Sequence, residues 1–217
     1  AGSLLMPFGG KNQSTPAQAM AAQLPVLPGE ETRQGSLFAW GCDPDCLSVD
    51  PYTGARAAIY SSVTKLVAAG GDYKKVYLTL QEFFERLRTE PDRWGKPFAA
   101  LLGALDAQLE LGAAAIGGKD SMSGTFMDKD VPPTVISFAI APVKSDDVIS
   151  NEFKEAGHPV YLFGTTNISD YDGLKKSWEQ YYALCQAGKV KASWAVDAGG
   201  IAEAVMKMSF GNDIGFV

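Results

Sequence analysis

Residue types able to bind an anion are concentrated in the stretch Gly117-Gly118-Lys119-Asp120-Ser121-Met122-Ser123. Adjacent glycines let a backbone approach a bulky anion and adopt positive φ, and successive N–H groups can then converge on its oxygens. Lys119 adds charge, and Ser121 and Ser123 add hydroxyl donors. The stretch predicts a phosphate-binding nest. The alternative is a glycine-rich turn whose polar residues face water, because such short motifs recur by chance. The Gly-x4-Gly-Lys-Ser/Thr spacing of a P-loop is absent.

Other candidate ligands and nucleophiles are sparse. The chain has one histidine, His158, and three cysteines, Cys42, Cys46 and Cys185. An odd, sparse cysteine set argues against a disulfide framework, and no second pair completes a tetrahedral zinc site with Cys42 and Cys46. A Ser-His-Asp triad would depend on the single histidine as its base. We therefore predict no metal ligands and no catalytic side chains in this chain.

The hydrophobic fraction and the net charge of the chain disfavour some classes of function. The chain has 217 residues, 46% of them hydrophobic, enough for one large core or two smaller ones. Its net charge of −6 disfavours nucleic acid and membrane surfaces as partners, since no basic stripe can neutralise many phosphates. The sequence shows neither a transmembrane-length apolar run nor a signal-peptide layout at its N-terminus. We expect a cytoplasmic protein.

A helix and a strand are predicted to position the glycine-rich stretch. The helix spans 97–111, and its apolar stripe consists of Phe98, Leu101, Leu102, Leu105 and Leu109. Gly112 follows as a C-cap, and the apolar run at 113–116 is short enough for a buried strand. The most β-rich run of the chain, at 134–140, predicts a further strand. This alternation is typical of an α/β fold.

Further elements divide the chain into four parts. A helix that begins after Asp50-Pro51 and ends at Gly70-Gly71 has an apolar face made of Ala55, Ala58, Ile59, Ser62, Val63, Leu66 and Val67. Additional strands are predicted at 37–40, 76–80, 160–164 and 190–196, and additional helices at 17–23, 81–88, 174–188 and from Gly199. The predicted parts are a loop-rich lead-in at 1–35, an α/β domain at 36–143, a charged linker at 144–158 and the truncated start of a second α/β domain at 159–217.

Several motifs together resemble the phosphoribosylformylglycinamidine synthase family of purine biosynthesis. The string from Gly117 to Ser123, followed by Pro132-Pro133-Thr134-Val135-Ile136-Ser137, is similar to the second synthetase half of that family. Similar segments also run from Pro7 to Gln18, from Asp50 to Arg56, from Arg93 to Pro97 and from Val190 to Gly215. The resemblance reaches almost the whole chain.

The resemblance implies an aminoimidazole-ribonucleotide-synthetase-like fold. In that fold an N-terminal α/β domain, here 36–143, pairs with a sister domain through its sheet, and a C-terminal α/β domain closes the cleft. It also implies an ATP-dependent ligase that converts formylglycinamide ribonucleotide to the amidine with ammonia from glutamine. ATP phosphorylates the amide oxygen of the substrate, and ammonia displaces the phosphate.

The resemblance also implies the site residues. Substrate would be contacted by Gly118, Lys119, Asp120, Ser121 and Ser123, and the nucleotide cofactor by Gly117 and Gly118. Ser121 is the main candidate for the substrate phosphate or a hydroxyl. Anchoring that phosphate orients the amide toward ATP, and such ordering lowers a reaction barrier. The complete enzyme would use ATP and magnesium, with the first synthetase half and the glutaminase domain as partners.

The sequence departs from the family at an auxiliary ADP site, where carboxylates bind magnesium in long family members. The corresponding positions fall near Asn12, Ser61, Lys65 and Ala195, and none of these residues is acidic. Magnesium needs hard, mostly anionic oxygen ligands, so we expect this site to be lost, with the Lys65 ammonium replacing a cation. A register shift of one residue would keep Asp197 as a ligand. We favour Asp197 as N-cap of the helix that begins near Gly199.

Two functional hypotheses follow. In the first, the chain is a fragment of the amide-to-amidine ligase that contributes the phosphate-binding loop and is inactive alone. In the second, it is a non-catalytic scaffold half that packs against the active half and the glutaminase domain. A related synthetase or kinase of the same fold is a more distant third option. An uncovered apolar sheet would favour a homodimer of the fragment.

Overall fold

The computed structural model describes residues 2–165 and 170–217. The chain forms two compact units. Unit 1 comprises Ala1–Ala39, Thr64–Tyr73 and Ala141–Val217, and unit 2 comprises Trp40–Val63 and Lys74–Ile140. The four parts predicted from the sequence include residues 1 and 166–169, which lie outside the described residues. The boundaries of those parts stay a prediction.

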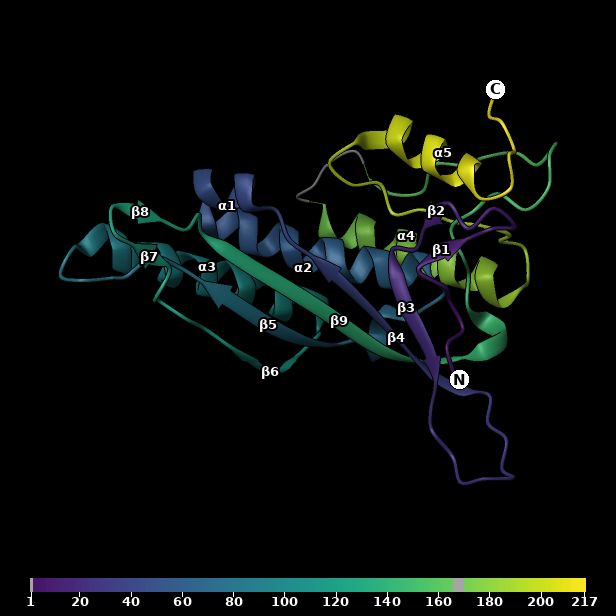
Figure 1. The fold of residues 1–217 in the computed structure, drawn as a ribbon, viewed down its shortest axis with the longest axis horizontal. Coiled ribbons are helices and arrows are strands. Elements are labelled where there is room, and N and C mark those ends of the chain that lie inside the picture. Colours follow the sequence, from purple (N-terminus) through teal and green to yellow (C-terminus); the bar gives the residue numbers. More distant parts are fainter. Residues whose placement is uncertain (1, 166–169) are drawn as a thin grey trace. The chain divides into compact units, whose positions relative to one another are not determined.

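Along the described chain, four strands come before the first helix, and further helices and strands follow (Figure 1). The helices are α1 (Pro44–Val49), α2 (Pro51–Ala68), α3 (Pro91–Leu111), α4 (Tyr171–Gln186) and α5 (Gly200–Phe210), with short 3-10 helices at Tyr73–Lys75 and Ser145–Asp147. The strands are β1 (Phe8–Gly9), β2 (Thr15–Pro16), β3 (Ala19–Gln23), β4 (Gln34–Gly41), β5 (Tyr77–Phe83), β6 (Ala115–Lys119), β7 (Thr125–Phe126), β8 (Lys129–Asp130) and β9 (Thr134–Lys144). One five-stranded sheet has the order β3-β4-β9-β5-β6, and β4 and β9 run through both units.

In unit 2, strand β5 lies between β9 and β6. It pairs antiparallel with β9, from Tyr77 opposite Ile140 to Phe83 opposite Thr134, and parallel with β6. Alternate residues of β9 are buried, and the Oγ atom of Ser137 lies 2.9 Å from that of Ser62 on α2. Helix α2 therefore packs on one face of these strands, behind them in the view of Figure 1. The predicted apolar face of this helix is confirmed, because all seven of its residues are buried.

Helix α3 packs on α2 through small residues. Ala100, Ala104 and Ala107 are fully buried, and a side chain at Gly103 would come within 2.1 Å of the Tyr52 carbonyl oxygen. The predicted stripe of large apolar side chains is exposed instead, with Leu101 at 55% and Leu109 at 71%. Small residues allow a close helix–helix approach, and that approach sets which face is buried.

In unit 1, β3 and β4 form an antiparallel hairpin, from Ala19 opposite Ala39 to Gln23 opposite Gly35. The helix predicted at 17–23 is therefore wrong, because these residues complete a backbone ladder with β4. The N-terminal segment also bonds to the end of α5. The Thr15 hydroxyl donates to the Lys207 carbonyl over 2.6 Å and accepts from the Gly211 N–H over 2.8 Å.

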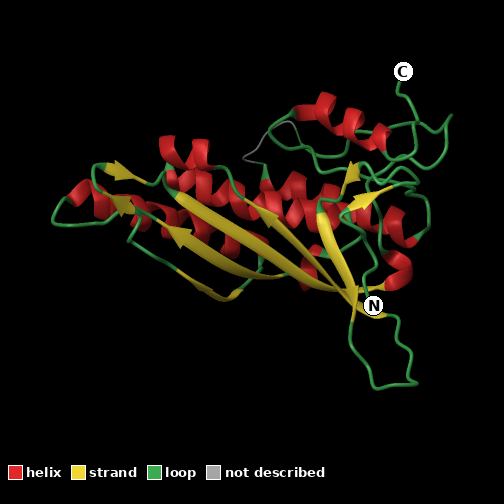
Figure 2. Cartoon of the chain, viewed as in Figure 1, coloured by secondary structure: helices red, strands yellow, loops and turns green. Residues whose placement is uncertain are grey.

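Other predicted elements are corrected by the structure. The helix at 81–88 is wrong, because β5 continues to Phe83 and a loop follows until α3 begins at Pro91, with Pro97 inside that helix. The strands at 160–164 and 190–196 are wrong too, because both segments are loops (Figure 2). The segment 160–163 is apolar but exposed. An apolar run forms a strand only where another strand pairs with it, and sequence periodicity does not report such a partner.

Candidate functional site

The predicted glycine-rich stretch begins in β6 at the edge of the sheet. Residues Ala115–Lys119 pair with β5 on one side, and all five are exposed. The run at 113–116 is thus not a buried strand, although Ala113 itself is 3% exposed. Exposure leaves Gly117, Gly118 and Lys119 accessible to a ligand.

The backbone of this stretch is extended rather than curled into a nest. The Ser121 N–H donates to the Glu82 carbonyl over 3.1 Å, and the Phe84 N–H donates to the Ser121 carbonyl over 2.9 Å. Successive N–H groups of an extended chain point in opposite directions, so they do not converge on one anion here. No nest forms in the part of the stretch up to Lys119, which is strand. The proposal that these residues bind phosphate now depends on their side chains.

One glycine in the stretch is required by the backbone. Gly118 has φ of +148°, and a side chain there would lie 2.1 Å from the Leu80 carbonyl oxygen. Gly117 has no described atom within 4 Å of the position of a Cβ. Gly118 therefore brings β6 close to β5, whereas Gly117 leaves open space at the exposed edge.

The polar side chains of the stretch lie at its accessible end. The hydroxyls of Ser121 and Ser123 are 2.8 Å apart, and Lys119 and Asp120 are exposed. The structure brings Ser121 and Ser123 together and places Lys119 on the adjoining strand. Two hydroxyls and one ammonium are donors of the kind that a phosphate accepts.

Two buried carboxylates beside this stretch were missed by sequence reasoning. Glu82 on β5 is 8% exposed, and burial, with the negative charge of Asp120 as the lesser cause, raises the pKa of Glu82 from 4.5 to about 7. Glu85 is 1% exposed, and its Oε1 atom lies 2.6 Å from the Lys96 ammonium. The signal in the sequence was that Glu82 lies inside, and Glu85 two residues after, a segment with large apolar residues.

The positions traced to the auxiliary ADP site do not fit magnesium. Lys65 is buried, and its ammonium lies 2.7 Å from the Asp197 carboxylate. The Asn12 amide donates to Asp213 over 2.7 Å. Asp197 is thus already paired with a cationic side chain. The N-cap role predicted for Asp197 is wrong, because Gly199 is the N-cap of α5 and makes no side-chain cap hydrogen bond.

Across residues 2–165 and 170–217, no group of three or more His, Cys, Asp or Glu side chains could hold a metal ion. All three cysteines are free thiols, and burial raises the pKa of Cys185 to about 11. Among the described segments, no helix combines the length and hydropathy needed to span a lipid bilayer.

Sequence comparison identifies relatives that carry one name. The chain is 26% identical over 99% of its length to the phosphoribosylformylglycinamidine synthase subunit PurL of Thermoplasma volcanium, and 28% identical over 75% of its length to that of Methanosarcina mazei. It spans only 30% and 23% of these two relatives. No family model matches the chain. The predicted resemblance is therefore confirmed, over a segment that is about 30% of the length of the first of these relatives.

Solved structures show the same fold. Thermotoga maritima PurL complexed with AMPPCP matches with a TM-score of 0.65 and 18% identity, over 87% of this chain and 28% of that one. Thiamine-monophosphate kinase from Stenotrophomonas maltophilia matches with a TM-score of 0.55 and 11% identity, over 83% of this chain and 63% of that one. The predicted mixed α/β, aminoimidazole-ribonucleotide-synthetase-like fold is confirmed.

Proposed function

We propose that this chain, a homologue of the phosphoribosylformylglycinamidine synthase subunit PurL, serves as one segment of an ATP-dependent ligase of purine biosynthesis. The ligase would act in the cytoplasm on formylglycinamide ribonucleotide, with glutamine as the nitrogen source and with ATP and magnesium. The observation that carries the proposal is the 26% identity to PurL over 99% of the chain. Because the chain spans 30% of that relative, the remaining machinery would come from a first synthetase half and a glutaminase domain.

Within that enzyme, the segment from Gly117 to Ser123 would bind the phosphate of the ribonucleotide. Gly117 and Gly118 keep the edge strand free of bulk, Lys119 supplies charge, and the hydroxyls of Ser121 and Ser123 donate hydrogen bonds. Asp120 and Glu82 lie beside these donors, and an anion would avoid both while they are ionised. A phosphate fixed at this edge would hold the substrate amide in a defined orientation toward ATP, and orientation lowers the activation barrier.

Binding of the ribonucleotide to the complete enzyme tests this proposal. We expect Ser121→Ala and Lys119→Ala each to weaken the apparent affinity by about tenfold, because each removes one charge-assisted hydrogen bond to phosphate. Lys129→Ala is the matched control, since Lys129 is equally exposed on β8. An affinity unchanged by both variants would remove the loop from substrate binding.

A scaffold function is the second candidate, and two contacts favour it. The Ser121 N–H and carbonyl are both engaged with the end of β5 and the residue after it, and Lys65, at a position traced to a metal ligand in the family, is paired with Asp197. Under this reading the chain packs against an active half and binds no ligand of its own. Normal substrate affinity of the Ser121 and Lys119 variants, together with loss of assembly when the chain is omitted, would support the scaffold.

A further inference from the structure

The hydroxyls of Ser121 and Ser123 lie on a segment, residues 120–124, that has no regular secondary structure. The Gly124 N–H donates to the Phe84 carbonyl over 2.9 Å, which continues the backbone contacts of Ser121 with the end of β5. A side chain at Gly124 would come within 2.9 Å of the same carbonyl oxygen. The segment therefore runs close against the residues that end and follow β5, and the position of its hydroxyls depends on what holds these two stretches together.

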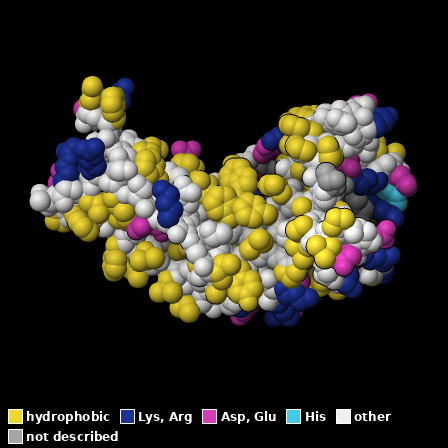
Figure 3. All heavy atoms as spheres, turned by 60° about the horizontal axis from the view of Figure 1, so that its bottom comes forward, with side chains coloured by type: hydrophobic (Ala, Val, Ile, Leu, Met, Phe, Trp, Pro, Cys, Tyr) yellow, Lys and Arg dark blue, Asp and Glu magenta, His cyan; other side chains and the backbone are white. Residues whose placement is uncertain are grey.

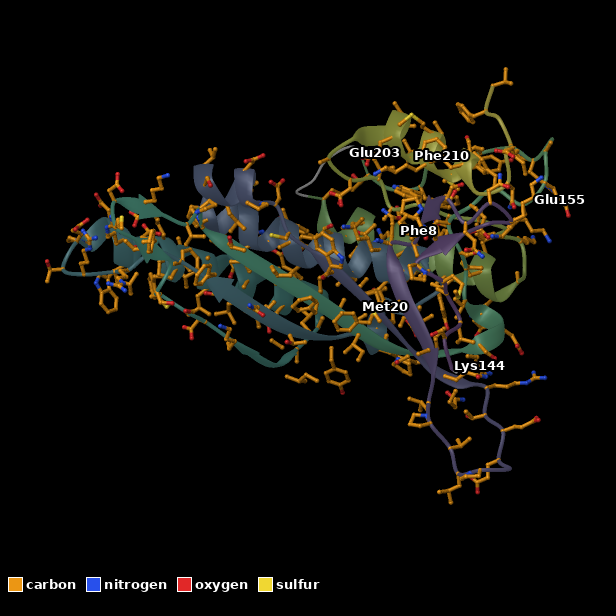
Figure 4. All side chains as sticks on the ribbon, in the orientation of Figure 1. Phe8, Met20, Lys144, Glu155, Glu203 and Phe210 are labelled. Carbon is orange, nitrogen blue, oxygen red and sulfur yellow. The ribbon has the colours of Figure 1, made fainter. Side chains whose placement is uncertain are left out.

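A closed ring of hydrogen bonds joins the two stretches just beyond this point. The Arg86 N–H donates to the Thr125 hydroxyl oxygen over 2.9 Å, and that hydroxyl donates to Asp130 Oδ1 over 2.6 Å. The Arg93 guanidinium closes the ring, because it donates to Asp130 Oδ2 over 2.6 Å and to the Arg86 carbonyl over 3.1 Å. All four residues belong to unit 2. Figure 4 draws the side chains of this region as sticks, at the end of the sheet where β7 and β8 are labelled in Figure 1.

Two features strengthen this Thr125 ring. The hydrogen bond from Arg93, and then that from Thr125, lowers the pKa of the Asp130 carboxyl group, so the ring contains a carboxylate at neutral pH. Hydrogen bonds to an ionised group are about twice as strong as neutral ones. Arg93 lies in the first turn of α3, where its Nε atom also donates to Glu90 over 2.7 Å. The ring therefore ties β7 and β8 to the start of a 21-residue helix.

The hairpin formed by β7 and β8 has little else to hold it in place. Its ladder consists of two residue pairs, Thr125 with Asp130 and Phe126 with Lys129, and isolated two-stranded hairpins are at best marginally stable. Thr125 is two residues from Ser123, and its N–H donates to the Ser123 carbonyl over 2.9 Å. The ring thus fixes one end of the segment that carries the two serine hydroxyls, while the backbone contacts of Ser121 fix the other.

We propose that the Thr125 ring positions the hydroxyls of Ser121 and Ser123 for the phosphate of the substrate, with Thr125 as its central positioning residue. The single hydroxyl proton of Thr125 is donated to Asp130, so Thr125 itself has none to offer a phosphate. Opening the ring would leave both serines in the chain but release the segment that orients them. This inference rests on the proposed function of residues 117–123 and adds a residue outside that stretch.

Steady-state kinetics of the complete enzyme with Thr125→Val and Thr125→Ser test the proposal. Valine has nearly the same shape but no hydroxyl, and serine keeps the hydroxyl. We expect Thr125→Val to raise KM for formylglycinamide ribonucleotide about three- to tenfold, which corresponds to the net contribution of about one hydrogen bond. Thr125→Ser should restore the wild-type value. KM for ATP should stay unchanged in both variants, because a general loss of structure would affect both substrates.

Thr134→Val is the matched control, since the Thr134 hydroxyl donates locally to the Pro132 carbonyl over 3.0 Å. It should leave KM for the ribonucleotide unchanged. Equal increases in KM for Thr125→Val and Thr125→Ser, or equal increases for both substrates, would overturn the proposal.

Ser121→Ala, measured in parallel, separates this proposal from the proposed function. If Ser121→Ala raises KM and Thr125→Val does not, the positioning role fails and phosphate binding by the stretch stands. If Thr125→Val raises KM and Ser121→Ala does not, phosphate binding by Ser121 fails and the positioning role fails with it. In the double variant KM should rise by less than the product of the two single effects, because both act on the same donor. A rise equal to that product would contradict a positioning role through Ser121.

Discussion

Glu82 is a carboxylic acid whose ionisation is strongly altered by the fold. Burial in the strand β5, and secondarily the charge of Asp120, raises its pKa from 4.5 to about 7. The native state therefore holds a proton on Glu82 at pH values where the unfolded chain has released it. Deprotonation would add a negative charge close enough to interact with Asp120, which lies in the segment proposed to bind phosphate, so protonation of Glu82 would favour anion binding there.

The raised pKa predicts how stability depends on pH. Between pH 4.5 and 7 the native state binds more protons than the unfolded state, so the free energy of unfolding should fall as pH rises through this window. The loss should reach roughly 2–3 kcal/mol and level off above pH 7. Urea denaturation at pH 5 and pH 8 measures it. Glu82→Gln should remove most of this dependence.

Asp120→Asn is the control for the charge contribution. It should lower the pKa of Glu82 slightly and leave most of the pH dependence, because burial is the larger cause of the shift. Identical pH profiles for wild type and Glu82→Gln would contradict the assignment of this dependence to Glu82.

The Lys96–Glu85 ion pair gives a second prediction for single residues. Glu85 is 2% exposed in its side chain, whereas Lys96 is 42% exposed. Lys96→Met should lower the free energy of unfolding by about 2–4 kcal/mol, because it leaves a buried carboxylate without its cation. Chemical denaturation at pH 7 measures the loss, and Lys129→Met on β8 is the matched control.

A double variant separates the charge from the packing. Adding Glu85→Leu to Lys96→Met should recover part of the stability, since an apolar group then replaces the unpaired charge. A Lys96→Met variant as stable as the Lys129→Met control would show that Glu85 needs no cation.

Sequence periodicity predicted buried apolar residues better than buried charges. The α2 face from Ala55 to Val67 was predictable, because a repeat of apolar residues at three and four positions identifies one helix face. Glu82 and Glu85 were not, because acidic residues are almost never fully buried unless paired, and their partners come from other elements. Among the predicted site residues, exposure at Gly117 and Lys119 is compatible with binding, whereas the nest conformation was not found.

At the scale of elements, helix packing determines which face of a helix is buried, and the periodicity of apolar residues did not predict that face for α3. The stripe on α3 was correctly identified as apolar, but Gly103 fits against the Tyr52 carbonyl and turns the small residues inward. The strands predicted at 160–164 and 190–196 failed for a related reason, since strand formation requires a partner strand. Sequence patterns predict the face of an element and leave open which neighbour that face meets.

The edge strand β6 supplies a prediction with an internal control. Gly118→Ala should destabilise the chain by about 1–3 kcal/mol, because φ of +148° disfavours a side chain and the new methyl group would meet the Leu80 carbonyl. Gly117→Ala should change stability by less than about 0.5 kcal/mol, because that position is open. Thermal and urea unfolding of both variants measure the difference. Equal effects of the two substitutions would show that Gly118 does not hold β6 close to β5.

At the scale of the whole molecule, many large apolar side chains of the described residues are exposed to solvent. Large apolar side chains are prominent on the surface drawn in Figure 3. Exposed large apolar side chains of unit 2 include Trp40 and Tyr77 on strands, each 53% exposed, and Phe98 on α3, 62% exposed. Apolar patches of this kind mark association surfaces. The net charge of −6 opposes unspecific aggregation, so a defined partner is the expected way to cover them.

We therefore predict that the isolated chain forms a homodimer through the outer face of its strands. Sedimentation velocity over a range of protein concentrations should show a monomer–dimer equilibrium. Trp40→Ser combined with Tyr77→Ser should shift it toward monomer by at least tenfold, with little effect on folding because both side chains are half exposed. The α3 double variant Leu101→Gln with Leu105→Gln is the control and should leave the equilibrium unchanged, since these side chains are 55% and 47% exposed on a different element. If the α3 variant alone dissociates the dimer, the interface lies on the helix, and a chain that stays monomeric at all concentrations would contradict self-association altogether.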